Sequence, residues 1–267
     1  MSAPILKERP LQRRLAVFGL ILMIGSLFWL QILPRSEPRS TAATMTTSRD
    51  NAITRVIIDA GHGGKDSGAM RNGIMEKDLT LDVAVRVQRL LQAQGLQAIM
   101  TRSGDEWISL AGRAAAANRE HDCVFVSIHF DEGARAAATG VQTFYAARQV
   151  QESSLPSWLP FLQSVAGDAP NLKSESLADF VQEALVKKTQ AFNRGTRAEQ
   201  FYVVANVRHP AVLIEGGFLS NNDDLSKLTT ENYREELAAA IADGILRYRE
   251  VAAEKPGTLA LRSGPAE

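Results

Sequence analysis

Short β-branched runs alternate with amphipathic helical patterns over residues 55–249, and this alternation constrains the fold more than any other feature. Such an order is typical of βαβ units arranged around a mostly parallel sheet. The run CVFVSIH at residues 123–129 is almost entirely apolar, as expected for a strand that is buried on both faces. We therefore expect a three-layer α/β fold, in which an open, mostly parallel sheet carries helices on both of its faces.

The periodicity also predicts the individual elements of one domain over residues 55–251. The expected strands are 55–60, 97–101, 123–129, 140–146, 200–205 and 211–215, and the expected helices are 77–94, 110–120, one from about residue 176, and 231–249. Asp179 is the candidate capping partner at the start of the third helix.

The chain begins with a basic segment and an apolar run. Residues 15–33 are uncharged, and their length is close to the roughly 20 residues that span a bilayer as a helix. Basic side chains precede this run, so residues 1–14 are expected to stay in the cytoplasm. Two interpretations stay open: an uncleaved anchor in the inner membrane, or a signal peptide removed after export. Both place the remainder on the periplasmic or cell-wall side.

Two further segments have the composition of connecting or terminal chain. Residues 34–54 are rich in Ser, Thr, Arg and Pro and are predicted to form a linker. Residues 252–267 are predicted to form a flexible tail.

Charge and cysteine content exclude several classes of function. Lys and Arg together number 30, as do Asp and Glu, so the chain has no basic excess for neutralising phosphates, and nucleic acid is not expected as a partner. Cys123 is the single cysteine, so it cannot close an intrachain disulfide or form a cysteine-rich zinc cluster. A metal site would therefore be built from histidines and carboxylates.

Polar residues gather at the carboxyl ends of the expected strands, where α/β sheets bind their ligands. His62 follows the first strand, His129 ends the central strand, and Glu215 ends the strand AVLIE. Glu76 starts the first helix after a loop whose glycines allow the chain to fold back. Two imidazoles and one carboxylate form the ligand set of hydrolytic zinc sites, and a second glutamate would serve as general base. The other histidines, His121 and His209, are expected at the opposite rim.

Three sequence blocks resemble one enzyme family. The blocks are VIIDAGHGGKDSGAMRNGIMEKDLTLDVA, FVSIHFD and PAVLIEGGFLSN, with TRSGDEWISLAGRAAAAN and NRGTRAEQFYVV between them. They resemble, in order, the signature blocks of the zinc-dependent N-acetylmuramoyl-L-alanine amidases of type 3, bacterial cell-wall enzymes that include the division amidases. The resemblance covers about residues 55–249.

The resemblance implies one zinc ion held by His62, Glu76 and His129, with Glu215 as the catalytic carboxylate. The implied reaction on peptidoglycan is hydrolysis of the amide between N-acetylmuramic acid and the L-alanine of the stem peptide. Two other hypotheses stay open: a non-catalytic murein-binding or activator protein, and a zinc carboxypeptidase that acts within the stem peptide.

Several residues near these positions have two interpretations. Ser127 either orients a ligand or hydrogen-bonds to the backbone, and Asp131 either supports a ligand histidine or lies in a solvated loop. The chain departs from the family pattern at Phe130, which is expected to narrow or cover the cleft, and at Gly216, where a bulkier residue is common. Asn221 and Asn222 are predicted to shape the turn after the last strand.

Residues 147–173 form an insertion relative to the smallest family members. It is interpreted either as a loop that packs its own apolar side chains or as a regulatory lid. The resemblance to the division amidases implies a lid that an activator protein displaces, with Glu152, Asp168 or Glu175 as the blocking carboxylate.

Overall fold

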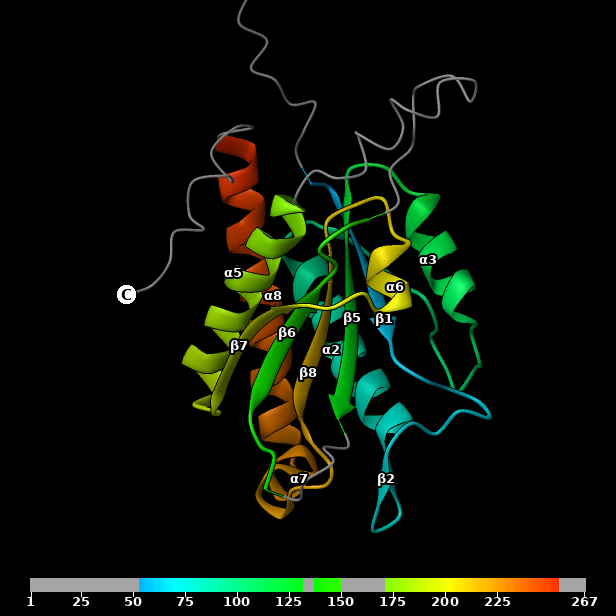
Figure 1. Ribbon diagram of the computed structural model, residues 1–267, viewed down its shortest axis with the longest axis vertical. Coiled ribbons are helices and arrows are strands. Elements are labelled where there is room, and N and C mark those ends of the chain that lie inside the picture. The colour runs from blue at the N-terminus through cyan, green and yellow to red at the C-terminus, as the bar shows by residue number, and fades with distance from the viewer. Residues whose placement is uncertain (1–52, 132–136, 150–170, 255–267) are drawn as a thin grey trace, which may run out of the picture. The chain divides into compact units, whose positions relative to one another are not determined.

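The computed structural model describes residues 53–131, 137–149 and 171–254, all within one compact unit that begins at Ser48 (Figure 1). The apolar segment 15–33 and most of the insertion at 147–173 lie outside these residues. Within the described ranges, no helix is both long and apolar enough to cross a membrane.

The order of elements follows the predicted alternation. The strands and helices are β1 (Arg55–Ala60), β2 (Met70–Arg71), β3 (Ile74–Met75), α2 (Glu76–Ala93), β4 (Gln97–Met100), α3 (Leu110–Asn118), β5 (Cys123–Asp131), β6 (Val141–Tyr145), α5 (Leu172–Thr189), β7 (Asn193–Ala198), α6 (Tyr202–Ala205), β8 (Ala211–Phe218), α7 (Asn222–Leu228) and α8 (Glu231–Glu254). The α8 helix includes residues 252–254, so the predicted tail begins three residues too early.

The main sheet has six strands in the order β4-β1-β5-β8-β6-β7. The first four are mutually parallel, β6 runs antiparallel to β8, and β7 runs parallel to β6. The predicted α/β class and mostly parallel sheet are therefore confirmed. The carboxyl ends of β1, β5 and β8 lie at the same edge of the sheet, which is the condition for the predicted site.

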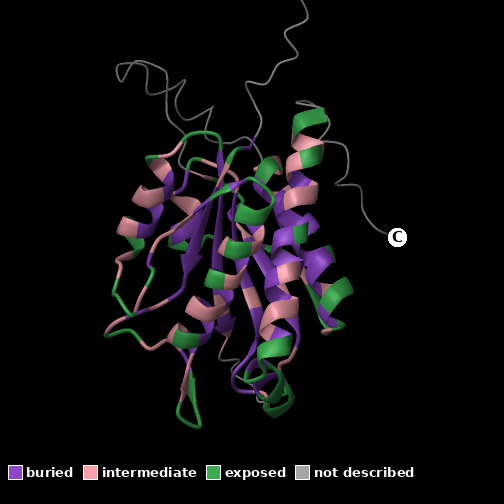
Figure 2. Ribbon diagram, turned by 180° about the vertical axis from the view of Figure 1, so that it is seen from behind, coloured by how far each residue is buried: buried purple, intermediate pink, exposed green. Residues whose placement is uncertain are grey.

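Helices cover both faces of this sheet, as predicted (Figure 1). One face packs against α2, α5 and α8 in a large apolar cluster that includes Val126, Ile214 and Leu237. The other face packs against α3 and α6 in a smaller cluster that includes Phe125 and Leu213. Figure 2 shows the buried residues concentrated on the strands and on the helix surfaces that face them. Neighbouring residues of a strand therefore point into different clusters.

One predicted strand is a helix, and one strand was missed. Residues 202–205 form the single turn α6, which buries Val203 and Val204 against the smaller cluster, so the β-branched character of this run reflects burial and not strand formation. The strand β7 lies just before it at residues 193–198. Its sequence NRGTRA is largely exposed, so the edge strand lacks the apolar signal that predicts strands.

Smaller differences concern the ends of elements. The third predicted helix begins at Leu172, and its capping side chain is Asn171, which accepts a hydrogen bond from the Ser174 amide. Asn221 accepts hydrogen bonds from the amides of Asp223 and Asp224 and so caps the short helix α7. The predicted role of Asn221 in the turn after β8 is thus more specific: it starts a helix.

Candidate metal centre

The chain folds back sharply directly after β1. Gly63, Gly64 and Gly68 have φ angles of +122°, +57° and +62°, a region that glycine enters without steric cost. His62 also has a positive φ of +59°, which is uncommon for a residue with a side chain and is typical of strained functional sites. A side chain at Gly68 would place its Cβ 2.4 Å from Glu76 Oε2, so the loop also needs glycine there for space.

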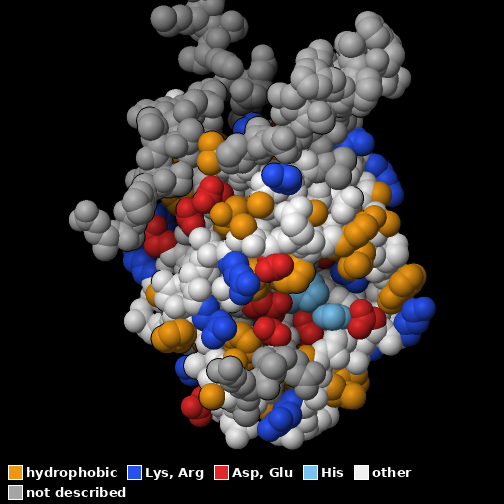
Figure 3. Space-filling view, in the orientation of Figure 1, with side chains coloured by type: hydrophobic (Ala, Val, Ile, Leu, Met, Phe, Trp, Pro, Cys, Tyr) orange, Lys and Arg blue, Asp and Glu red, His pale blue; other side chains and the backbone are white. Residues whose placement is uncertain are grey.

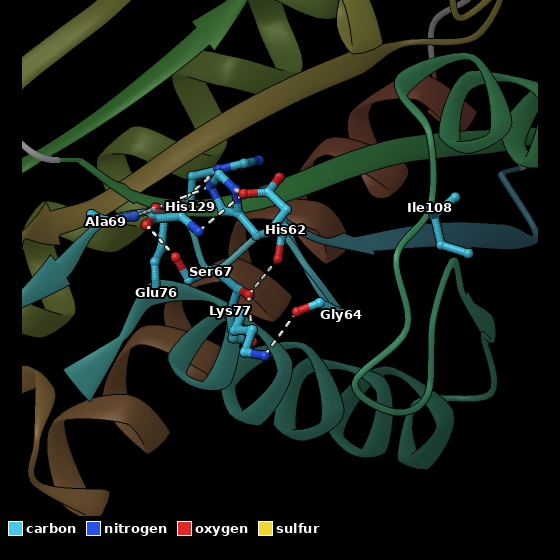
Figure 4. A network of polar contacts seen from close by, with 12 residues as sticks. His62, Gly64, Ser67, Ala69, Glu76, Lys77, Ile108 and His129 are labelled. Atoms are coloured by element: carbon cyan, nitrogen blue, oxygen red, sulfur yellow. Dashed lines mark hydrogen bonds and ion pairs between the residues drawn. The ribbon is translucent and has the colours of Figure 1, made fainter. Parts of the chain in front are cut away.

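The Glu76 carboxylate contacts both histidines in the polar network of Figure 4. Its Oε2 lies 3.0 Å from His62 Nε2, and its Oε1 lies 3.0 Å from His129 Nδ1. The same two oxygens accept hydrogen bonds from the amides of Ala69 and Phe130 at 2.9 and 3.0 Å. The residue that starts α2 is therefore fixed between the two histidines by the loop on one side and β5 on the other.

These three side chains present a donor set that fits a metal ion. His62 Nε2 lies 3.2 Å from His129 Nδ1, which completes a triangle of closely spaced atoms. Ligands at about 2.0 Å from a tetrahedral zinc ion are separated by roughly 3.3 Å, close to the distances within this triangle. Within the described residues, His62, Glu76 and His129 are the group of histidines and acids close enough together to hold such an ion. The structure thus brings together the predicted ligand set.

Burial and charge in this cluster shift the pKa values of Glu76 and His62. Burial raises the pKa of Glu76, but hydrogen bonds and charge from His129 and His62 outweigh burial and hold this pKa well below its usual range. Burial lowers the pKa of His62, but the contacts with Glu76 and Asp66 outweigh it and raise the pKa. His62 Nδ1 lies 3.0 Å from Asp66 Oδ1, on the side of the ring away from Glu76. Asp66 was not predicted, although it stands four residues after His62.

Glu215 lies beside this cluster. It is the register partner of His129 on the neighbouring strand β8, and both side chains lie on the sheet face that packs against α3 and α6. Its Oε2 is shielded from solvent and has no hydrogen-bond partner among the described residues. Burial, together with the negative charges of Glu76 and Asp131, raises the pKa of Glu215 well above its usual range. A carboxyl group in this state readily holds a proton, as an acid–base catalyst requires.

A buried ion pair lies beneath the site. Asp59 at the end of β1 is fully buried and lies 2.7 Å from Arg113 Nη1. It also accepts hydrogen bonds from Thr101 Oγ1 at 2.6 Å and Ser127 Oγ at 2.8 Å. The predicted partner of Ser127 was either a ligand or the backbone, and the structure instead gives it the side chain of Asp59.

Two buried arginines bind the backbone around His62. Arg113 donates to the carbonyl oxygens of Ala60 and His62 at 2.6 and 2.5 Å. Arg102 donates to those of Ala60 and Gly61 at 3.0 and 2.8 Å. Charge-assisted bonds to three successive carbonyls hold the loop in its unusual conformation. Both arginines come from the block TRSGDEWISLAGRAAAAN. Arg113 stands in an alanine-rich run, which was a signal for a buried charge, whereas the polar neighbours of Arg102 gave no such signal.

The remaining candidate residues fall in different places. Asp131 ends β5 beside the site, where its charge acts on Glu215. Glu175 lies on α5 and accepts a hydrogen bond from Tyr145, which packs against the large apolar cluster on the sheet face opposite that of His129 and Glu215. Glu152 and Asp168 lie outside the described residues. His121 and His209 precede the starts of β5 and β8, so they lie at the opposite rim, as predicted.

Phe130 and Gly216, the two departures from the family pattern, are neighbours in the structure. The Phe130 side chain is 1 % exposed and belongs to the large apolar cluster, so it does not cover the cleft, contrary to the prediction. A Cβ atom at Gly216 would lie 2.8 Å from Phe130 Cε1. The phenylalanine therefore takes up the space that a side chain at position 216 would need. Strand alternation explains the error, because His129 faces the site and its neighbour must face the core.

The site is open on one face of the molecule. Figure 3 shows histidine side chains at the surface amid acidic side chains, with Lys, Arg and apolar side chains around them. His62 and His129 are each about one-fifth exposed, which leaves room for a further ligand or a substrate.

Comparisons with known proteins assign the chain to a family. The family profile of N-acetylmuramoyl-L-alanine amidases matches residues 56–247. The chain is 36% identical over 193 residues to the uncharacterized protein YqiI of Bacillus subtilis, covering 72% of this chain and 84% of that protein. It is 31% identical to the N-acetylmuramoyl-L-alanine amidase AmiA of Escherichia coli, covering 72% and 75%.

A solved structure shows the same architecture. The catalytic domain of CwlV, an N-acetylmuramoyl-L-alanine amidase from Bacillus (Paenibacillus) polymyxa, superposes with a TM-score of 0.62 at 32% identity, covering 74% of this chain and 99% of that domain. The chain belongs to the N-acetylmuramoyl-L-alanine amidase family and is a hydrolase of this class.

Proposed function

We propose that the chain is a zinc-dependent peptidoglycan amidase that hydrolyses the amide between the lactyl group of N-acetylmuramic acid and the L-alanine of the stem peptide. The observation that carries this proposal is the convergence of His62, Glu76 and His129, with Glu215 adjacent to them. His62 Nε2, His129 Nδ1 and the Glu76 carboxylate would hold the ion. When bound, zinc polarises the scissile carbonyl and lowers the pKa of water.

The protein residues supply the proton transfers and the orientation. Glu215 accepts the proton of the attacking water and delivers it to the departing amine, a role that suits a carboxyl group with a raised pKa. Asp66 contacts Nδ1 of His62 and would hold the ring so that Nε2 faces the ion. Arg102 and Arg113 fix the backbone of the same histidine. Because Glu215 can act as base and acid in turn, no covalent intermediate with the protein is required.

The cellular setting of this activity is a further part of the proposal. Peptidoglycan lies outside the cytoplasmic membrane, so the substrate requires export, which agrees with the predicted role of residues 15–33 as anchor or signal peptide. Regulation by a lid at residues 147–173 and by an activator protein stays a prediction, because the central part of that insertion lies outside the described residues.

Product analysis tests the proposed reaction. Purified sacculi are digested with the full-length chain, and the soluble products are separated and their amino termini identified. We expect intact stem peptides with a free L-alanine amino group, and loss of the products in the presence of a chelator with recovery on adding zinc. Release of single amino acids would indicate a carboxypeptidase, and binding without release of any peptide would indicate a non-catalytic murein-binding protein.

A further inference from the structure

One row of side chains runs across four strands from the candidate metal centre. Glu215 on β8 is the register partner of His129 on β5 and of Gln142 on β6. Gln142 and Phe144 are two residues apart on β6, so their side chains lie on the same face of the sheet. Phe144 packs in the smaller cluster with α3 and α6, so Gln142 lies on the same face as His129 and Glu215. The row therefore continues beyond the proposed catalytic carboxylate toward the sheet edge.

Arg194 on the edge strand β7 ends this row. Its Nε donates to Gln142 Oε1 at 3.5 Å, and the Gln142 side-chain amide donates to the Arg194 carbonyl at 3.4 Å. Its guanidinium carbon lies 4.9 Å from the centre of the Phe218 ring. These contacts place the exposed guanidinium next to Gln142 and Phe218.

The charge of Arg194 has no acidic partner in the described part of the chain. Its hydrogen bonds go to the neutral oxygens of Gln142 and Thr139, both at 3.5 Å. Arg197 on the same strand differs, because it forms an ion pair with Glu199 at 3.6 Å. The long bonds of Arg194 to neutral groups leave most of its donors available to an anion, since guanidinium carries five N–H groups in a planar fork.

The spacing of the strands fits a peptide that extends from the candidate metal centre to Arg194. Neighbouring strands are about 4.8 Å apart, so β7 lies roughly 10 Å from β8, which an extended peptide spans in about three residues.

We propose that Arg194 binds a carboxylate of the peptide half of the substrate, with Gln142 and Phe218 holding the guanidinium in position. This inference rests on the proposed amidase function, and it assigns the two halves of the substrate to opposite sides of the site. The peptide that leaves lies over β6 and β7, and the glycan lies on the side of the β1–α2 loop. Arg194 is then a specificity-determining residue, because it selects peptides with a free carboxylate within the first three residues.

Matched substrates test this assignment in the zinc-loaded full-length chain. The substrates are N-acetylmuramoyl tripeptides. One has free carboxylates on the second and third residues, and two others each have one of these carboxylates amidated. We expect Arg194→Ala to raise KM about tenfold for the substrate with both carboxylates free, with kcat nearly unchanged, because one charge-assisted contact is lost. For the substrate that is amidated at the residue bound by Arg194, we expect Arg194→Ala to change KM by less than twofold. Arg194→Lys should recover part of the affinity.

Arg197→Ala is the control, since it removes an exposed arginine of the same strand without touching the row. Calorimetric titration with the released peptide gives a readout independent of turnover, and we expect Arg194→Ala to weaken this binding by a similar factor. An equal effect of Arg194→Ala on free and amidated peptides, or no effect on either, would overturn the assignment. If the wild type cleaved no substrate, the proposed function would fail, and the calorimetric comparison would still decide the role of Arg194.

Discussion

His129 and Glu215 are direct partners in register on the neighbouring parallel strands β5 and β8. One is a proposed metal ligand and the other the proposed catalytic carboxylate, so their separation is set by the hydrogen-bonded ladder of the sheet. Sites built on strands are held more precisely than sites built on loops. The same sheet edge receives His62 from the loop after β1, where Arg113 binds its carbonyl oxygen, and Glu76 from the start of α2.

Glu215→Gln is predicted to lower kcat by about 10²- to 10⁴-fold while leaving the metal content unchanged. The amide keeps the shape of the side chain but can neither accept the proton from water nor return it to the amine. Steady-state kinetics and metal analysis of the same sample provide the measurement. Glu183→Gln, exposed on α5 where it contacts Arg247, is the control and should retain full activity. Substantial turnover by Glu215→Gln would remove this residue from the chemistry.

Gly61→Ala is predicted to lower zinc affinity by about 10- to 100-fold, the range typical of changes that displace a metal ligand from outside. A Cβ at this position would lie 2.4 to 2.7 Å from three atoms of the His129 ring, so the imidazole must move. Zinc affinity is measured by competition with a chelator. Gly104→Ala is the matched control, because its nearest neighbour is the flexible Glu106 side chain at 3.4 Å. Equal zinc affinities of the two variants would contradict the prediction.

The sequence predicted the class of fold, and it predicted that His62, Glu76, His129 and Glu215 would meet at one edge of the sheet, as they do. His62, His129 and Glu215 were recognisable because each stands at or just after the end of a strongly apolar run, and parallel strands bring the ends of such runs together. The strands β5 and β8 continue two and three residues beyond His129 and Glu215. The supporting residues Asp59, Arg102 and Arg113 were not predicted, because their roles depend on contacts between segments far apart in the chain. Arg113, for example, contacts Asp59 across 54 positions. The polar edge strand β7 was missed for a related reason, since its pairing with β6 leaves no periodic signal in the sequence.

Arg113→Ala is predicted to destabilise the protein by about 3–5 kcal/mol, because it leaves the Asp59 carboxylate buried without its charge partner. The two side chains are 4% and 0% exposed. The free energy of unfolding is measured by denaturant titration of the metal-free protein. The control is Arg247→Ala, which breaks an exposed contact with Glu183 and should cost less than about 1 kcal/mol. Similar losses in both variants would show that the buried pair has no special role.

Phe130 and Gly216 are predicted to be energetically coupled. Gly216→Ala alone should cost about 1–3 kcal/mol, since its Cβ would lie 2.8 Å from the buried Phe130 ring. In a Phe130→Leu background the same change should cost less, because the shorter side chain makes room. A double-mutant cycle of unfolding free energies measures the coupling, which we expect at about 0.5–2 kcal/mol. Strictly additive effects would mean that the two positions adjust independently.

Protons are predicted to compete with zinc at His62. Metal binding requires the neutral imidazole, and the contacts with Glu76 and Asp66 raise the pKa of His62 despite its burial. Glu76 stays ionised throughout this range because its pKa is strongly lowered. Zinc affinity should therefore be constant above the raised pKa of His62 and should fall by up to about tenfold per pH unit below it.

Asp66→Asn separates this titration from a general effect of acid. The change removes the negative charge 3.0 Å from His62 Nδ1 but keeps an oxygen that can accept the hydrogen bond from the Gly68 amide. The pKa of His62 should fall, so the pH at which zinc affinity begins to decrease should move to lower values. Asp243→Asn, exposed on α8 and remote from the site, should leave this pH unchanged. Chelator competition across a pH series measures both variants, and an unshifted profile in Asp66→Asn would show that a group other than His62 limits binding.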